Sequence, residues 1–439
     1  MAVTRSVGQK VSVDVRYVGT LGRKLYSNIN INGPNFLYNG LKGAFDAARS
    51  GGESQLLDDL FRGINIAGAG FGAVGTVFNG VLQTGAAHLR AATASNIRNN
   101  LANGNYNALA ATLNTLNYSK SAGLNPTLPD IPALVNGAVL RFSGQFPENF
   151  IKTNPQFNNA ILETNLGNTN YHSMQAQLTL QPAAGMSFQG TYTWSKFLGR
   201  GTSGTYTNPV DRSGDYTVQP SDRRHDFRTN GTFELPIGPG KLLLGHTSGV
   251  VARAIEGWQM SWIINLTSGP PVNILAQDML YGLGVPDIVG AFPSDARGVR
   301  WTTGAIAGNY FESGALKTVA DPQCGAVASN LRSLCTLQAV ADAKTNQILL
   351  QNPQPGTRGT FGQNVLQLPG RWRFDASMGK SFKINETKSI LFRADAQNVF
   401  NHPEPASPTL NINDATVQFG NIASKSGIRQ FQAQLRFTF

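Results

Sequence analysis

Apolar and polar residues alternate along several stretches of this chain, and that alternation limits what the chain can fold into. The last ten residues read QFQAQLRFTF, with an apolar side chain at every second position from Phe431 to the terminal Phe439. Successive side chains of a β-strand point to opposite faces, so a period of two is typical of a strand with one apolar and one polar face. The pattern recurs in VSVDVRY at 11–17, MQAQLTL at 174–180 and WQMSWIINL at 258–266. The sequence therefore predicts an all-β chain.

About nine strands are predicted in this way. They cover residues 8–18, 23–30, 170–181, 185–197, 226–236, 255–267, 371–383, 388–399 and the C-terminal stretch. The first two strands are separated by the sequence GTLG, which is predicted to form a tight turn because glycine is a favoured turn residue.

Short and long connections alternate between these strands. The short ones contain GTLG, PAAG and NET, and a medium link opens with PIGPGK. The long ones cover residues 31–169, 198–225, 268–370 and 400–429. Loops longer than about 12–15 residues are uncommon in compact soluble domains, whereas outer-membrane barrels combine short periplasmic turns with long extracellular loops. The pattern favours an antiparallel transmembrane β-barrel whose last strand runs toward the periplasm, and disfavours a secreted soluble β-sandwich enzyme.

The two faces of these strands have different expected surroundings. Strands in hydrocarbon must close into a barrel, because an open edge leaves backbone N–H and C=O groups unpaired. The apolar face is then expected to meet lipid, and the polar face to line a lumen. The charged residues expected on the lumen face are Arg228, Glu234, Arg373, Asp375, Arg393 and Asp395. They form either a hydrogen-bonded ladder between neighbouring strands or contacts with a plug domain or a substrate.

Aromatic residues stand near the ends of several predicted strands. Such residues form girdles at both membrane interfaces of outer-membrane barrels. The girdle candidates are Tyr17, Trp194, Trp258 and Trp372. Ordinary core packing of a soluble sheet is the alternative interpretation.

Composition agrees with strands and loops rather than with a soluble helical enzyme. Charged residues make up 14% of the chain, below the roughly 25% of an average protein. The 36 basic and 25 acidic residues give a net charge of 36 − 25 = +11, which suits anionic lipid headgroups. No compact basic cluster, helix-turn-helix pattern or zinc spacing supports a nucleic-acid partner.

Neither the N-terminus nor any internal segment has the pattern of a membrane-spanning or signal helix. The opening MAVTRSVGQK contains no apolar signal-peptide core. Residues 63–87 lack charge but are rich in glycine and contain Asn, Gln and Thr, whereas a spanning helix needs about 20 mainly apolar residues. This segment is predicted to be a pliable loop with a short helix.

The two cysteines, Cys324 and Cys335, are separated by ten intervening residues and have no CxxC neighbour or nearby histidine. The spacing argues against a metal site or a thioredoxin-like motif. A disulfide that closes a local loop is predicted, which implies an oxidising, extracytoplasmic location. Two free thiols are the alternative.

Catalytic and cofactor motifs are not found in a suitable context. The sequence DRRHD places His225 between arginine and aspartate residues, but no second histidine at metal-ligand spacing accompanies it. We interpret it as a polar cluster where the connection 198–225 enters the barrel. No enzyme activity, cofactor or metal is expected.

An ordered set of segments resembles the C-terminal half of Oar-like TonB-dependent outer-membrane receptors, the type that contains a carboxypeptidase-regulatory-like domain. The segments lie at 171–196, 221–238, 257–274 and 392–405 and at the aromatic C-terminal end. The resemblance covers roughly residues 8–439 and is best from residue 165 onward.

The resemblance implies part of a large barrel of roughly 22 strands with a plugged lumen. In that family the plug and the TonB-contacting segment precede the barrel, and residues 1–439 are expected to contain barrel strands without the plug. Contact with the inner-membrane TonB complex would then pass through that plug. A terminal aromatic is part of the signal that the barrel-assembly machinery reads, a role that would fall to Phe439 together with Phe437.

The expected function is that of a barrel segment that takes part in the uptake of a bulky nutrient across the outer membrane. The alternatives are a structural or adhesive surface protein, which would bind through the loops 31–169 and 268–370, and a non-functional receptor fragment. Fold alone does not identify the nutrient.

Overall fold

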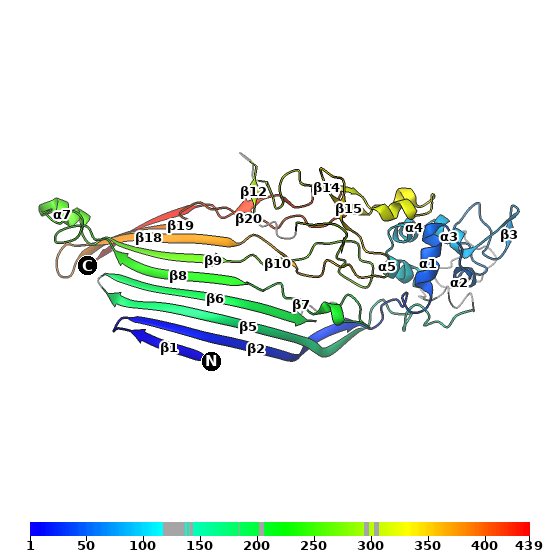
Figure 1. The fold of residues 1–439 in the computed structure, drawn as a ribbon, viewed down its shortest axis with the longest axis horizontal. Coiled ribbons are helices and arrows are strands. Elements are labelled where there is room, and N and C mark those ends of the chain that lie inside the picture. Colours follow the sequence, from blue (N-terminus) through cyan, green and yellow to red (C-terminus); the bar gives the residue numbers. More distant parts are fainter. Residues whose placement is uncertain are drawn as a thin grey trace.

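The computed structural model describes residues 1–439 except 117–136, 138–139, 141–143, 184, 202–205, 294–297 and 303–306. Its main feature is one large antiparallel sheet, in which each strand pairs with the next along the chain (Figure 1). The path consists of β1 (Ala2–Val7), β2 (Val11–Asn30), β5 (Ile161–Ala183), β6 (Met186–Arg200), β8 (His225–Glu234), β9 (Gln259–Thr267), β18 (Arg371–Lys383), β19 (Ser389–Gln397) and β23 (Gln430–Thr438). The short β7 (Thr217–Val218) pairs with β6. The all-β, antiparallel prediction is confirmed.

The prediction for the first two strands is wrong. The sequence GTLG does not turn, because β2 runs through it and pairs Thr20 with Tyr171 and Leu21 with Asn170 of β5. The turn instead lies at residues 8–10, where Gly8 has a φ of +67° that favours glycine. The register shifts just after Gly22, so these glycines mark a bulge within a strand.

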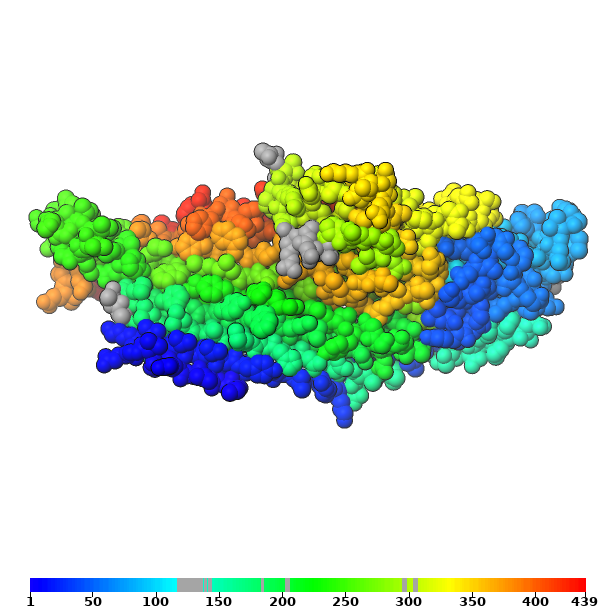
Figure 2. All heavy atoms as spheres, viewed as in Figure 1, coloured from blue at the N-terminus to red at the C-terminus, as the bar shows by residue number. Residues whose placement is uncertain are grey.

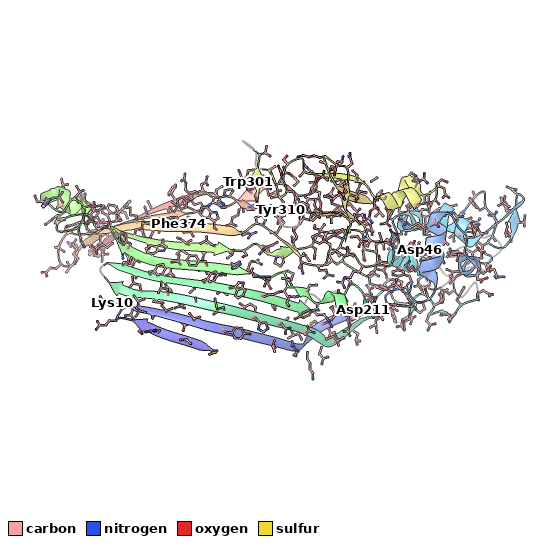
Figure 3. The ribbon with its side chains drawn as sticks, viewed as in Figure 1. Lys10, Asp46, Asp211, Trp301, Tyr310 and Phe374 are labelled. Carbon is pink, nitrogen blue, oxygen red and sulfur yellow. A yellow bond between two sulfur atoms is a disulfide. The ribbon has the colours of Figure 1, made fainter. Side chains whose placement is uncertain are left out.

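The alternation of short and long connections survives this correction. The short turns at 8–10, at Gly185 and at 384–388 and the medium link at 235–258 lie at one end of the sheet, on the left in Figure 1. The long connections at 31–160, 201–224, 268–370 and 398–429 leave from the other end. We refer to these as the periplasmic and extracellular ends. Figure 3 shows Lys10 and Asp46 at opposite ends of the molecule.

The sheet has one apolar and one polar face that continue across the strands. Strand register aligns an apolar row from β2 to β23: Val11, Leu180, Phe188, Gly231, Trp262, Ala376, Ala396 and Phe431. It aligns a polar row on the other face: Asp14, Gln177, Thr191, Arg228, Asn265 and Arg373. The glycine in the apolar row makes room for a neighbouring ring, since a Cβ atom on Gly231 would lie 2.5 Å from Cζ2 of Trp262.

Strand lengths show how far the sheet extends. β8, β9, β19 and β23 contain 10, 9, 9 and 9 residues, close to the roughly 9–11 residues of a tilted membrane-spanning strand. β2 and β5 contain 20 and 23 residues, so their extracellular halves extend beyond the bilayer. None of the helices within the described residues is long and apolar enough to cross a membrane.

Much of the connection 31–160, predicted to be a loop, forms a helical unit. It contains α1 (Leu41–Ser50), α2 (Gln55–Leu60), β3 (Val77–Phe78), β4 (Val81–Leu82), α3 (Gly85–Ala91), α4 (Ser95–Ala102) and α5 (Tyr106–Asn114). Phe45, Leu57, Leu101 and Tyr106 are fully buried in its core. The segment 63–87 is therefore a small hairpin that leads into α3. Part of the predicted loop, 117–136, lies outside the described residues.

The connections 268–370 and 398–429 pack together into a second extracellular unit, the distal sheet unit. Its sheet consists of β11 (Asp287–Ile288), β16 (Ile348–Gln351), β15 (Gln338–Asp342) and β14 (Leu316–Ala320). Shorter elements are β10 (Pro271–Val272), β12 (Arg300–Trp301), β13 (Gly308–Asn309), β17 (Leu366–Gln367), β20 (Glu404–Pro405), β21 (Asn421–Ile422), β22 (Lys425–Ser426), η3 (Pro322–Ala326) and η4 (Arg332–Leu334). Its core includes Ile274, Tyr310, Leu350 and Ile412. In Figure 2 it lies between the helical unit and the strands.

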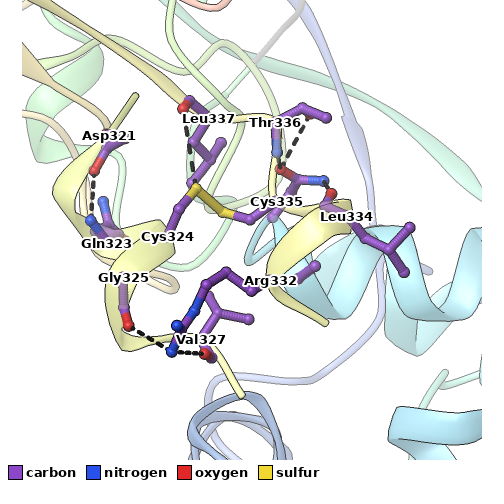
Figure 4. Close-up of a disulfide and its surroundings, with 12 residues drawn as sticks. Asp321, Gln323, Cys324, Gly325, Val327, Arg332, Leu334, Cys335, Thr336 and Leu337 are labelled. Carbon is purple, nitrogen blue, oxygen red and sulfur yellow. Dashed lines mark hydrogen bonds between the residues drawn. A yellow bond between two sulfur atoms is a disulfide. The ribbon is translucent and has the colours of Figure 1, made fainter. Parts of the chain in front are cut away.

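The structure joins Cys324 and Cys335 in a disulfide that closes the segment around η3 and η4 (Figure 4). Val327 and Leu331 of this segment are buried in the core of the helical unit. The backbone N–H of Thr336 donates to Oδ1 of Asn103 over 2.8 Å. The disulfide-closed segment thus connects the two extracellular units.

The faces of β5 give a direct stability test. Leu178 lies in the apolar face and Gln177 in the polar face. Replacing a lipid-facing residue by arginine near the midplane costs roughly 2–4 kcal/mol. We expect Leu178→Arg to lower the free energy of unfolding by that amount and Gln177→Arg to change it much less, as measured by urea unfolding in lipid vesicles. Equal effects at the two positions would contradict the assignment of the faces.

The helical unit is expected to lose stability in acid. His88 is fully buried, its Nε2 atom lies 3.2 Å from Oε1 of Gln83, and burial lowers its pKa to about 4. In the unfolded chain the pKa of histidine is about 6.5, so between these values the unfolded chain binds a proton that the folded one does not. The free energy of unfolding is therefore highest above pH 6.5 and falls as the pH drops toward 4, by at most about 3 kcal/mol.

This effect is measured by thermal unfolding of the full chain at several pH values between 7 and 4. Proteolytic cleavage within residues 41–114 reports the unfolding of the helical unit. The loss of stability in acid should shrink in His88→Gln, which lacks the buried imidazole. It should persist in His246→Gln, because His246 is exposed at the periplasmic end. An unchanged acid dependence in His88→Gln would contradict the assignment.

Candidate functional site: the polar sheet face and an extracellular cavity

The predicted lumen residues lie on the polar face, where most of them form ion pairs. Arg228 Nη2 contacts Asp226 Oδ2, Arg373 Nε contacts Asp375 Oδ1, and Arg393 Nη2 contacts Asp395 Oδ1, each at 2.8 Å. Each pair joins residues two positions apart, because side chains at that spacing share a face of a strand. Glu234 lies at the periplasmic end, with its Oε1 atom 3.4 Å from Nζ of Lys241.

The pairs run along the strands, whereas the ladder hypothesis placed them across neighbouring strands. The register explains this difference. Asn265 of β9 stands between Arg228 of β8 and Arg373 of β18, so an amide separates these two arginines. One of the cross-strand contacts is the hydrogen bond from Arg373 Nη2 to Oε1 of Gln397 over 3.1 Å.

These charged groups contribute little to the stability of the sheet. The side chains of Arg228, Arg373 and Arg393 are 65%, 42% and 51% exposed. Solvent-exposed ion pairs contribute little to stability, typically about 0–1 kcal/mol. They therefore give the polar face a hydrated surface that carries both positive and negative charges.

The four girdle candidates lie at two levels of the apolar face. Tyr17, in the middle of β2, is in register with Met174, Trp194 and His225. Trp372 lies one row nearer the periplasm, because it pairs with Leu266, which pairs with Phe227. These three aromatic residues therefore form one band on the extracellular side.

Trp258 directly precedes β9 at the periplasmic end. Phe437, on β23, pairs with Ile390, and its ring stacks on that of Phe439 at 5.9 Å between centroids. The terminal Phe439 is 89% exposed.

A cavity of about 1070 Å³ lies where β8, β9 and β18 meet the extracellular connections. Its lining includes Arg224, His225, Ser268, Trp301, Trp372 and His402; Trp301 and Phe374 of the neighbouring β18 are labelled in Figure 3. Ligand pockets commonly have volumes of roughly 300–1,000 Å³. The cavity is thus large enough for a bulky solute.

Several lining groups are positioned by contacts behind them. The ring centroids of His402 and Trp372 lie 4.2 Å apart. The backbone N–H of His225 donates to Oγ of Ser268 over 2.9 Å. Burial lowers the pKa of His402, which favours the uncharged form of its imidazole. Among the described residues, Arg224 Nε and His402 Nδ1 are buried atoms without a hydrogen-bond partner.

These groups can hold a solute by hydrogen bonds and by apolar contact. A guanidinium and an imidazole supply hydrogen-bonding groups, and the indole rings supply apolar surface. No group of three or more His, Cys, Asp or Glu side chains suited to a metal is found in the part of the chain that the structure describes.

Sequence reasoning placed only part of this site. It located the DRRHD cluster at the top of a strand, and His225 is indeed the first residue of β8. It missed Trp301, Ser268 and His402, which come from connections that the alternation of strands does not describe. The sequence feature that could have indicated these residues is the presence of isolated tryptophan and histidine residues in long connections.

The protein family follows from a match along nearly the whole chain. The family model of the outer membrane beta barrel domain matches residues 1–432. The chain belongs to this outer-membrane β-barrel family. The protein is therefore located in the outer membrane, and the sheet is part of its β-barrel domain.

Two solved structures are similar to this chain. One is the outer membrane transporter YddB from Escherichia coli, with 8% identity and a TM-score of 0.32 over 99% of this chain and 32% of that one. The other is the ferric-catecholate import receptor Fiu from Escherichia coli K12 in its closed form, with 14% identity and a TM-score of 0.12 over 64% of this chain and 46% of that one. This outer-membrane β-barrel chain thus spans less than half the length of either. A search of curated proteins finds no match.

Proposed function

We propose that this chain forms part of the wall of a TonB-dependent receptor of the Oar-like type, and that it takes part in the uptake of a bulky nutrient. The observation that carries the proposal is the cavity at the extracellular end of the sheet, where the long connections meet β8 and β18. In the outer membrane, a solute held there would lie at the extracellular end of the sheet.

The direction of the edge strands supports a barrel larger than nine strands. β1 and β23 are the two ends of the strand order, and both run toward the periplasmic end. An antiparallel barrel requires an odd number of further strands between two edges that run the same way. Single-chain outer-membrane barrels have even strand numbers, and those of outer-membrane transporters reach roughly 22. Two copies in the same membrane orientation would meet edge to edge in parallel, which argues against closure by oligomerisation alone.

Uptake of a bulky solute through such a barrel needs an energy source. In the proposed function the TonB complex of the inner membrane acts through a plug domain, as the sequence resemblance implies. The solvated ion pairs of the polar face would then contact the plug or the passing solute.

A second candidate function is adhesion at the cell surface. The observation that favours it is the size and order of the two extracellular units, each of which has its own buried core. Ordered cores present fixed surfaces to a partner, which unstructured loops do not.

Depletion of solutes from a complex medium distinguishes these functions. We expect cells with the gene to deplete bulky solutes that deletion cells leave behind, as measured by mass spectrometry, and inactivation of TonB to have the same effect as the deletion. The double variant Arg224→Ala, Trp372→Ala should deplete less, because it removes a cation and an aromatic wall from the cavity. The control Val210→Ala should behave as the wild type, since Val210 is 72% exposed and is not part of the cavity lining.

The outer-membrane level of each variant is compared by immunoblot, so that a folding defect is recognised. Depletion that is identical with and without the gene would contradict transport, and loss of surface attachment in the same cells would favour adhesion. Depletion that continues without TonB would contradict the proposed energy source.

A further inference from the structure

The connection 235–258, between β8 and β9, differs from the other turns at the periplasmic end. It carries α7 (Gly249–Ile255), which Figure 1 shows at the far left of the molecule. It also exposes several aliphatic side chains: Leu242, Leu243, Leu244, Val250 and Val251. Leu242 and Val250 are each 85% exposed.

The turn that carries these exposed side chains is ordered. The backbone N–H of Leu243 donates to the carbonyl of Pro236 over 2.9 Å, and that of Gly238 donates to the carbonyl of Leu243 over 3.0 Å. Aliphatic side chains held outward by a folded backbone indicate a surface with an apolar partner.

A lysine on the apolar sheet face ties α7 to that face. Lys380 lies between Met378 and Phe382 on β18 and pairs with Phe392 of β19. A lysine on the lipid side of a barrel is destabilising unless it finds partners. Its Nζ atom donates to the carbonyl oxygen of Arg253 in α7, and Lys380 is only 4% exposed.

Aromatic rings surround the same ammonium group. Nζ of Lys380 lies 4.7 Å from the ring centroid of Phe382 and 5.9 Å from that of Trp258. Such cation–π contacts stabilise a cation that has left water. Lys380 therefore lies beneath α7 and does not face the lipid.

The C-terminal carbonyls of α7 are satisfied by these same residues. The carbonyl of Ala252 accepts from the backbone N–H of Glu256 over 3.0 Å. That of Ala254 accepts from Nε1 of Trp258 over 3.0 Å, and that of Arg253 accepts from Lys380. The last turn of a helix leaves such carbonyls free unless other groups cap them. A girdle tryptophan and a strand lysine thus fix α7 to the apolar face of the sheet.

We infer that residues 242–251 form a membrane anchor that inserts into the periplasmic leaflet of the outer membrane, with phospholipid acyl chains as its partner. The apolar surface of this anchor is continuous with the lipid-facing side of the sheet, because α7 is bound to Lys380 and Trp258 on that face. Interfacial helices of this kind bury their apolar side roughly 5–10 Å into the boundary between headgroups and acyl chains. The anchor would fix the height of β8 and β9 in the bilayer.

The test measures where Val250 lies in native outer membranes. The full chain carrying Val250→Cys is labelled with a nitroxide, and its accessibility to oxygen, which partitions into lipid, is compared with that to a water-soluble nickel chelate. The two native cysteines are joined in a disulfide, so the new thiol is the target of the label. The matched control is Val210→Cys, an exposed position in the extracellular connection 201–224.

We expect the ratio of oxygen to nickel accessibility to be several-fold higher at Val250 than at Val210. Equal ratios would overturn the inference, because they would place α7 in water. Shielding of Val250 from both reagents would also overturn it, because a protein partner would then cover the patch.

The role of Lys380 is tested by adding Lys380→Met to the labelled Val250→Cys chain. Methionine keeps an apolar side chain over β18 but removes the ammonium that caps Arg253. We expect the label to become more mobile and its oxygen-to-nickel ratio to fall toward the value at Val210. An unchanged spectrum and ratio would show that Lys380 does not hold the anchor.

Discussion

Backbone hydrogen bonding between neighbouring strands is the constraint on which the rest of this structure depends. In the hydrocarbon of a bilayer no water satisfies an N–H or C=O group, so each strand must find its partners in the next one. The unbroken order from β1 to β23 meets this requirement for the strands inside the sheet. Once the register is set, side-chain direction is also set, because a shift of one residue would exchange the apolar and polar faces.

The register accounts for the site as well as for the fold. It places arginine and aspartate residues two apart on the polar face, where they pair along single strands and stay hydrated. It places Tyr17, Trp194 and Trp372 in two adjacent rows of the apolar face, which form the aromatic band. It also aims Lys380 at the apolar side, where the carbonyl of Arg253 in α7 supplies its partner. Each of these positions follows from the period of two and from the pairing of the strands.

The period of two predicted the strands of the sheet and their faces well, since it reports directly on side-chain direction. It failed at GTLG, where glycines that suggest a turn mark a bulge in a long strand. It also missed the helical unit, although Leu41, Ala44, Phe45 and Ala48 follow a helical spacing and are buried. The cavity was not predictable in this way, because Arg224, Ser268, Trp301 and His402 come from separate connections that meet only through tertiary packing.

The apolar face of the sheet is expected to meet lipid, and the polar face is expected to meet an aqueous lumen. The most direct measurement replaces residues 174–180 of β5 one at a time by cysteine and records, in native outer membranes, the labelling of each thiol by a reagent confined to water. We expect labelling at every second position, at Gln175, Gln177 and Thr179, with protection at the apolar positions between them. Labelling without this period, or labelling confined to the apolar positions, would contradict it.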